Sequence, residues 1–252
     1  MLTGAQPSRL QFFVSLKHRR ITCGRRVSNL HSSRSLQAKT LALQSSPMTD
    51  YRFQPKGLRS NLGWYDRGYI PHFDGGQIPQ FLTFRLFDSL PQAVVERWHG
   101  EMASNGGSGK ILFRKNVENY LDKGDGRCFL RDSGVAKLVE DSLLFHHEKK
   151  YVLSAWVIMP NHLHFLATPC ENVELREIAH SIKSYTAHEA NKLLKRRGQF
   201  WQHEPFDRYI RNRKHFGSVI RYIENNPVKA GLCAKAEEWQ FSSARCKATG
   251  AR

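Results

Sequence analysis

Hydrophobic and polar positions follow regular periods over most of the chain, and these periods predict its helices and strands. Residues 80–87 (QFLTFRLF) form a β-branched and aromatic run that predicts a strand. A helix is expected next, over about 91–102, and the glycine-rich segment 105–109 ends it. Residues 110–122 again show a helical pattern.

A strand hairpin is predicted in the middle of the chain, after one more helix. That helix has Asp132 or Ser133 as its cap and carries an apolar stripe of Val135, Leu138, Val139 and Leu143. Residues 151–159 (YVLSAWVIM) are apolar on both faces, which is typical of a central strand covered on both sides. Residues 160–161 make the turn, and HLHFLAT is the paired strand.

The longest helical pattern covers residues 174–196. Five of its residues, spaced 3, 4, 3 and 4 apart, share one face: Leu175, Ile178, Ile182, Tyr185 and Glu189. A further helix is expected over about 215–225, ending at Asn226–Pro227, and residues 239–241 add a short strand. Strand, helices, hairpin and long helix in this order predict an α+β domain with an antiparallel sheet.

The two ends of the chain differ from this periodic region. Residues 1–47 are rich in Ser and Arg and lack periodicity, so they are either a targeting-like extension or the product of an upstream start codon before Met48. Residues 48–76 are punctuated by Gly and Pro and are expected to form a loop-rich arm. The domain is then predicted over 77–230, with a C-terminal tail at 231–252.

The charge indicates a polyanionic partner. The chain carries a net charge of +17, and its first 49 residues hold eight Lys or Arg and no acidic residue, so the remainder still has a net charge of +9. Lys and Arg gain affinity for phosphates by releasing counterions, which favours nucleic acid over an anionic membrane surface. Five scattered cysteines without CxxC spacing argue against a disulfide framework and for a reducing compartment.

The HLH sequence at 162–164 is the first candidate for chemistry. Side chains at i and i+2 of a strand point to the same face with Cα atoms roughly 6.5–7 Å apart, so His162 and His164 can meet at one metal ion. They can equally be two polar residues on a wet sheet face. Tyr185 favours the first interpretation, because it shares a helix stripe with Ile178 and Ile182, which should face the sheet. The alternative for Tyr185 is a packing residue with a wet hydroxyl.

Several blocks of the sequence together resemble one group of transposases. NHLHFL after a hydrophobic strand resembles the HUH motif (His, hydrophobic, His) of single-tyrosine transposases. The similarity narrows to the REP-associated tyrosine transposases, relatives of the insertion-sequence-200-like transposases that act on single-stranded DNA. It rests on the blocks PHFDGGQIPQFLTFRL, AWVIMPNHLHFLATP, KSYTAHEANKLLKRRGQFWQ, FDRYIR and RYIENNPVKAGL, over about residues 60–245.

The resemblance implies a ferredoxin-like antiparallel sheet with helices, of the HUH nuclease type, and a metal-dependent transesterification. His162 and His164 would bind Mg²⁺ or Mn²⁺, which acts as a Lewis acid on the scissile phosphate. Tyr185 would attack the phosphorus and leave a 5′-phosphotyrosine and a free 3′-OH. Because the covalent link conserves the free energy of the phosphodiester, a 3′-OH can reseal the strand without ATP.

A third metal ligand is expected from the tyrosine helix, since a hard divalent ion prefers oxygen donors. Glu189, four residues after Tyr185, is the oxygen donor on that face, although relatives often carry an amide in this role. Its alternative is an exposed ion pair with Lys192.

Basic and aromatic residues on and after the long helix are expected to contact DNA. The alternatives are a solvated charged face for the cations and core packing for the aromatic residue. The predicted DNA-binding residues are Lys183, Lys192, Lys195, Arg196, Arg197, Trp201, Arg208 and Arg211.

The expected partner is a single-stranded DNA hairpin of a repetitive extragenic palindrome, bound by a monomer in the bacterial cytoplasm. Two other functions stay open from the sequence. One is a non-catalytic regulator that binds DNA hairpins and derives from a transposase. The other is an RNA-binding module on a ferredoxin-like sheet, although the strands show no RNP-like aromatic pattern.

Overall fold

The computed structural model describes residues 63–66, 71–104 and 106–250. The extension expected at 1–47 lies outside these residues, as does most of the arm expected at 48–76.

A four-stranded antiparallel sheet forms the centre of the molecule. Its strands lie in the spatial order β4-β5-β3-β6. Their bounds are β3 (Gln80–Arg85), β4 (Tyr151–Ile158), β5 (His162–Pro169) and β6 (Phe206–Tyr209). The long connection from β3 to β4 ends with the helix α4 (Ser133–His146), and α5 (Leu175–Leu193) connects β5 to β6. The order β-α-β-β-α-β with this strand arrangement is ferredoxin-like, so the predicted α+β fold is confirmed.

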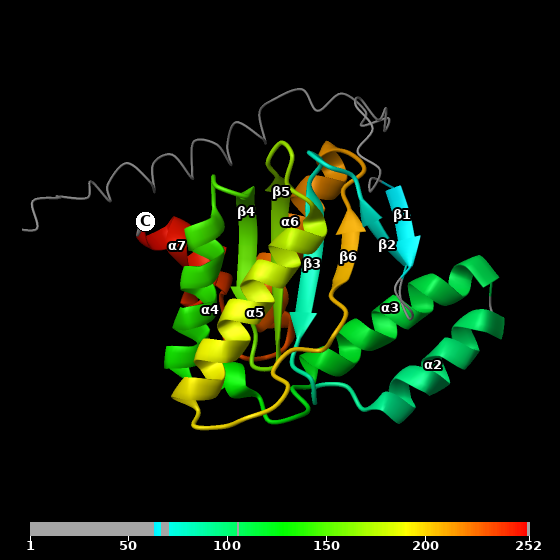
Figure 1. Ribbon diagram of the computed structural model, residues 1–252, viewed down its shortest axis with the longest axis horizontal. Helices are drawn as coiled ribbons and strands as arrows, with labels where there is room; N and C mark the ends of the chain where they lie inside the picture. The colour runs from blue at the N-terminus through cyan, green and yellow to red at the C-terminus, as the bar shows by residue number, and fades with distance from the viewer. Residues whose placement is uncertain (1–62, 67–70, 105, 251–252) are drawn as a thin grey trace, which may run out of the picture.

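Helices cover both faces of the sheet. Figure 1 shows α4 and α5 in front of the strands and α6 (Arg213–Lys229) behind them. The predicted cap of α4 is Asp132, whose side chain accepts a hydrogen bond of 3.0 Å from the Val135 amide. A capping box at Glu174 and Glu177 starts α5, and its buried positions follow the predicted helical period as far as Ile182.

The side chains of β5 point alternately to the two faces of the sheet, and this alternation decides which helices they face. Leu163 and Phe165 pack in the core formed with α4 and α5. Leu166 packs in the second core, beneath α6. His162 and His164 share the parity of Leu166, and the ring of His164 contacts Phe81 of this second core, with ring centres 5.2 Å apart. The histidine pair therefore faces α6, with the sheet between it and α5.

The helices α2 (Gln92–Ser104) and α3 (Gly106–Asp122) form a hairpin between β3 and α4. Figure 1 shows this hairpin projecting beside the β3–β6 side of the sheet. The second helix of this hairpin was predicted over 110–122, which is too short, since α3 begins at Gly106. The hairpin has a small core of its own, made by Leu90, Val95, Trp98 and Phe113.

Three other expectations are wrong. Part of the expected loop-rich arm forms β1 (Gly63–Asp66) and β2 (Pro71–Asp74), which pair antiparallel. The helix α6 continues through Pro227 to Lys229, because a proline this close to the end of a helix removes only one late hydrogen bond. The tail forms a 3-10 turn (Ala236–Glu238) and α7 (Ser243–Thr249), and the expected strand at 239–241 is reduced to a single bridge beside it, between Val157 and Ser242.

None of the helices in the described ranges combines the length and the apolar character needed to cross a bilayer.

Candidate metal and nucleophile site

His162 and His164 lie side by side in a closed site on β5. Both are buried, and their ring centres are 4.6 Å apart. Nδ1 of His162 lies 2.7 Å from Oδ1 of Asn161, and Nδ1 of His164 lies 2.7 Å from the Thr83 hydroxyl on the neighbouring strand. Because the Asn161 oxygen only accepts, neutral His162 carries its proton on Nδ1 and keeps a lone pair on Nε2, as in a metal-ligating imidazole.

Burial keeps both imidazoles neutral. It lowers the pKa of His162 to about 3, and the positive charge of Lys229 lowers it further. Burial also lowers the pKa of His164 well below its usual value, followed by the effects of His162 and Lys229. Neutral imidazole is the form that binds a metal, so the pair is in its ligating state at physiological pH.

Two residues of α6 complete the site. Tyr222 is partly buried, and its ring centre lies 5.6 Å from that of His164. Asn226, one helical turn later, is fully buried. Positions i and i+4 of a helix share a face, so the phenol and the amide both point toward the histidine-bearing side of the sheet.

The polar atoms of this group fit a bound divalent cation. Within the described chain, Nε2 of His162 and both side-chain polar atoms of Asn226 are buried without a hydrogen-bond partner of ordinary geometry. Buried polar atoms are nearly always satisfied, so such a cluster indicates a place for an ion or water. Two imidazole nitrogens and an amide oxygen suit Mg²⁺ or Mn²⁺ when water and substrate oxygens fill the other positions. The described residues offer no set of three or more His, Cys, Asp or Glu for a metal, so in this group the third protein donor would be the Asn226 amide.

The environment of Tyr222 opposes its ionisation. Burial raises the pKa of the phenol above its usual value of 10.0, and the carboxylates of Glu118 and Asp122 on α3 raise it further. The Asn226 side chain and the Arg208 guanidinium lower it. The phenol is therefore protonated at neutral pH, and a nucleophilic role requires added positive charge or removal of the acidic neighbours.

The structure corrects the predicted positions of Tyr185 and Glu189. Both residues lie on α5, which packs on the opposite face of the sheet from the histidine pair. Tyr185 is 53% exposed, and Glu189 forms an ion pair of 2.9 Å with Lys192. The buried stripe of α5 turns through Thr186 and Ala190, because the helix period of 3.6 carries positions 185 and 189 out of contact with the sheet.

Among the predicted DNA-binding residues, Lys183, Arg196 and Trp201 are held by contacts with other parts of the fold. Lys183 donates to the Gln202 and His203 carbonyl oxygens, at 2.5 and 2.6 Å. Arg196 donates to Asn191 and Gln199 and lies over the Phe129 ring. Trp201 is buried in the core, and its Nε1 donates to the Thr186 hydroxyl at 2.9 Å, so it is no platform for unpaired bases.

The other predicted cations divide between two surfaces. Arg208 lies beside Tyr222 on the histidine side of the sheet and contacts His215, and Arg211 follows it in the chain. Lys192, Lys195 and Arg197 are exposed at or just after the end of α5, which lies on the opposite face of the sheet from the histidine pair. Of the eight predicted residues, Arg208 is the one that the structure brings next to the candidate site.

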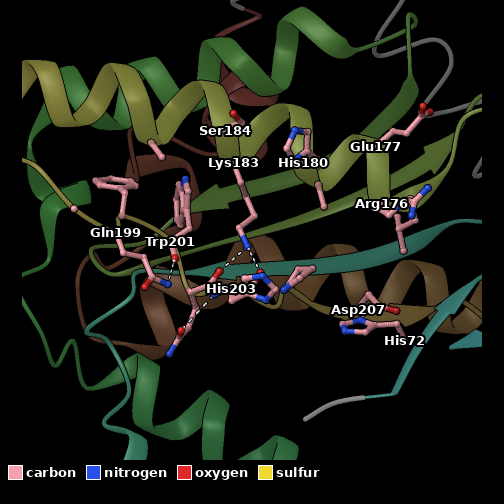
Figure 2. Close-up of a pocket in the computed structure, with 17 residues that line it drawn as sticks. His72, Arg176, Glu177, His180, Lys183, Ser184, Gln199, Trp201, His203 and Asp207 are labelled. Carbon is pink, nitrogen blue, oxygen red and sulfur yellow. Dashed lines mark hydrogen bonds and ion pairs between the residues drawn. The ribbon is translucent and has the colours of Figure 1, made fainter. Parts of the chain in front are cut away.

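A separate groove follows α5 on that other face. Figure 2 shows His180, Lys183 and Ser184 of α5 opposite Gln199, Trp201 and His203. The dashed lines show Lys183 tied to the backbone of the facing segment. The sheet separates this groove from the histidine pair.

Sequence reasoning missed Tyr222 and Asn226. Both lie in the block RYIENNPVKAGL, which contributed to the resemblance without an assigned role. The available signal was the i, i+4 spacing of a phenol and an amide on the apolar side of a helix, next to Ile223. The prediction that the helix ended at Asn226 weakened that signal.

Comparisons with known proteins find similarity over the part of the chain that contains these residues. Residues 137–226 match the family model described as "Transposase IS200 like", a segment that contains the histidine pair, Tyr222 and Asn226. A REP-associated tyrosine transposase of Escherichia coli (strain K12) is 29% identical over 97 residues, which cover 38% of this chain and 56% of that protein. The match thus spans little more than half the length of that relative.

A solved structure of a REP-associated tyrosine transposase bound to a REP hairpin is also similar to this chain. It shares 21% sequence identity and has a TM-score of 0.42, covering 75% of this chain and 87% of that one.

Proposed function

We propose that this chain is a member of the IS200-like transposase family, whose model matches residues 137–226, and that it nicks and rejoins single-stranded DNA with Tyr222 as nucleophile. The observation that carries the proposal is the grouping of Tyr222, Asn226, His162 and His164 on one side of the sheet. This grouping replaces the assignment of Tyr185 and Glu189 made from the sequence.

His162, His164 and Asn226 would hold the divalent cation. When bound, Mg²⁺ or Mn²⁺ supplies Lewis-acid stabilisation of the negative charge that develops on the scissile phosphate. The role of the protein is to keep the imidazoles neutral and oriented, which Asn161, Thr83 and burial accomplish.

Tyr222 carries the covalent step. Its phenol loses a proton, and its oxygen forms a bond to phosphorus while the bond from phosphorus to the 3′ oxygen breaks. The 3′ oxygen takes up a proton and leaves as a free 3′-OH, and the 5′ phosphate stays on the tyrosine. Arg208 assists this step, because its positive charge favours the phenolate. Attack by a 3′-OH reverses the sequence and restores both the phosphodiester and the phenol.

The proposed substrate is a DNA hairpin formed by a palindromic repeat. Two observations support it: the similar solved structure is described as bound to a REP hairpin, and the chain carries a net charge of +17. The net charge supports binding to polyanions in general, through counterion release. The choice of a DNA hairpin among polyanions rests on the first observation alone.

One observation favours the second function, a hairpin-binding regulator without catalysis. His162 and Asn226 are fully buried, so a scissile phosphate does not reach them in this arrangement of the helices. A nicking test separates the two functions.

The test uses Mn²⁺ and a labelled oligonucleotide that carries a hairpin with single-stranded flanks. Wild-type protein should cleave it and form an adduct that survives denaturing electrophoresis, and Y222F should abolish the adduct while keeping hairpin affinity within about twofold. Y185F is the matched control, since it removes a hydroxyl from α5 on the other side of the sheet, and it should keep both activities. An adduct that persists in Y222F, or is lost in Y185F, would contradict the proposal.

A further inference from the structure

The candidate site is covered by α3 of the helical hairpin. Phe113, Val117, Glu118 and Leu121 of this helix line a closed space together with His164. Phe113 and Leu121 are buried in this position. A DNA strand therefore reaches His164 from this side only if α3 moves away from it.

An ion pair fastens the end of α3 to α6. Nζ of Lys229, in the last turn of α6, lies 2.7 Å from Oδ2 of Asp122, the last residue of α3. The side chain of Lys229 is 49% exposed, whereas that of Asp122 is 12% exposed. The other carboxylate oxygen of Asp122 is buried and has no hydrogen-bond partner within the described chain.

Lys229 belongs to the surroundings of the metal-binding group. It follows Asn226 by three residues, so the two side chains leave neighbouring positions of the helix. Its charge acts on both His162 and His164. A phosphate that approached the histidine pair would meet this ammonium group. In the present structure the ammonium group is paired with the carboxylate of Asp122.

We propose that Lys229 is a binding residue for the phosphodiester backbone at the cleavage site, and that Asp122 occupies it as an internal anion, so that α3 is a cover displaced by DNA. The proposal rests on the function proposed above and adds to it a phosphate-binding residue and an autoinhibitory contact. The cation exchanges one anion for another, the carboxylate of Asp122 for a phosphate oxygen.

Two features make the exchange feasible. A partly exposed ion pair is a weak contact, so phosphate can compete for the lysine. The helical hairpin of α2 and α3 has a core of its own, separate from the two cores on the sheet. These two helices can therefore shift together while the rest of the domain keeps its packing.

DNA affinity tests the proposal without any catalysis. The full chain is titrated with a hairpin oligonucleotide in EDTA at several salt concentrations. D122N should bind about three- to tenfold more tightly than wild type, because Lys229 is released. K229M should bind more weakly and should lower the slope of log affinity against log salt by about one. D122N/K229M should match K229M, and E101Q, which neutralises an exposed carboxylate on α2, should match wild type.

Exchanging the two charged residues distinguishes the role of Lys229 in binding DNA from its role in the ion pair that holds α3 against α6. D122K/K229D keeps an ion pair between the same positions, so its thermal midpoint should stay near that of wild type, yet its DNA affinity should fall as in K229M. Hydrogen exchange in α3 should accelerate when the oligonucleotide is added to wild type, and in D122N without it.

Unchanged or weaker DNA binding by folded D122N would overturn the proposal, as would an unchanged salt slope in K229M. Slower exchange of α3 in the presence of DNA would overturn the displacement. Failure of this proposal can be distinguished from failure of the proposed function. The proposed function fails if Y222F still forms the adduct with Mn²⁺, whereas the affinity measurements described here are made in EDTA.

Discussion

Asn226 lies one helical turn after Tyr222, and the two side chains interact on the histidine side of the sheet, where the amide lowers the pKa of the phenol. The ring of Tyr222 lies 5.6 Å, centre to centre, from that of His164. One turn of one helix thus brings both a phenol and an amide toward the imidazoles. Any displacement of α6 moves the two groups together.

Removal of the Asn226 amide should weaken metal binding. N226A leaves the two imidazoles as the protein donors, and we expect the affinity for Mn²⁺ to fall by at least about 10- to 100-fold, the loss typical when only an outer-shell partner of a metal ligand is removed. N226D keeps an oxygen donor and should retain most of the affinity. Calorimetry or electron paramagnetic resonance of free Mn²⁺ measures this without DNA.

Glu189, the third ligand expected from the sequence, provides the control for this experiment. E189Q removes a carboxylate from the exposed side of α5 and should leave the Mn²⁺ affinity unchanged. Equal Mn²⁺ affinity of N226A and wild type would rule out the amide as a ligand.

The Thr83 hydroxyl should be needed to orient His164. T83V keeps the shape of the side chain but removes the hydrogen-bonding partner, 2.7 Å away, from Nδ1 of the histidine. Loss of such an orienting group costs about 10- to 100-fold in metal affinity. T168V is the matched control, because the Thr168 hydroxyl is also buried in the sheet yet has no hydrogen-bond partner within the described chain. A T83V protein that binds Mn²⁺ like T168V would contradict this role.

The sequence predicted three of the four strands of the sheet, β3, β4 and β5, and missed the short edge strand β6. Residues 151–159 are apolar on both faces and are followed by a tight turn, so the hairpin of β4 and β5 was determined by local pattern alone. The α+β class followed from the order of the elements. These features depend on short-range periodicity, which is visible in the chain itself.

The partner of each sheet face was not predictable in the same way. Both faces of β5 carry apolar residues, Leu163 and Phe165 on one and Leu166 on the other, so hydrophobicity does not say which helix covers the histidines. The sequence suggested α5 because Tyr185 shares a helical stripe with Ile178 and Ile182, which were expected to face the sheet. The answer depends on the pairing of β5 with β3, a long-range property, and it moves the proposed nucleophile from Tyr185 to Tyr222.

Trp201 should contribute to stability and not to DNA binding. W201F removes the hydrogen bond to Thr186 and part of a buried ring, and we expect a loss of about 1–3 kcal/mol in the free energy of unfolding. The affinity of the folded protein for the hairpin should stay within about twofold, because the ring is 4% exposed. Denaturant titration and fluorescence anisotropy measure the two quantities. A selective loss of DNA affinity would restore the stacking role.

Lys183 should give the unfolding free energy a distinct pH dependence. Burial lowers the pKa of its ammonium group to about 8, with a further decrease from Arg85, while Glu204 raises it. The unfolded chain, with a lysine pKa of about 10.4, therefore binds more protons than the folded one between about pH 8 and 10. Stability due to this group rises with pH in that window, and it is lowest below pH 8, where the buried ammonium stays charged.

K183M removes this titration. The free energy of unfolding of wild type minus that of K183M should increase by about 1 kcal/mol per pH unit between pH 8 and 10, and should be flat below pH 7. K192M serves as the control, since Lys192 lies on the exposed side of the same helix, and its difference from wild type should change little in this window. Denaturant titrations at half-unit pH intervals give the curves. Parallel curves for wild type and K183M would show that the two carbonyl oxygens bound by the ammonium group offset the cost of its burial.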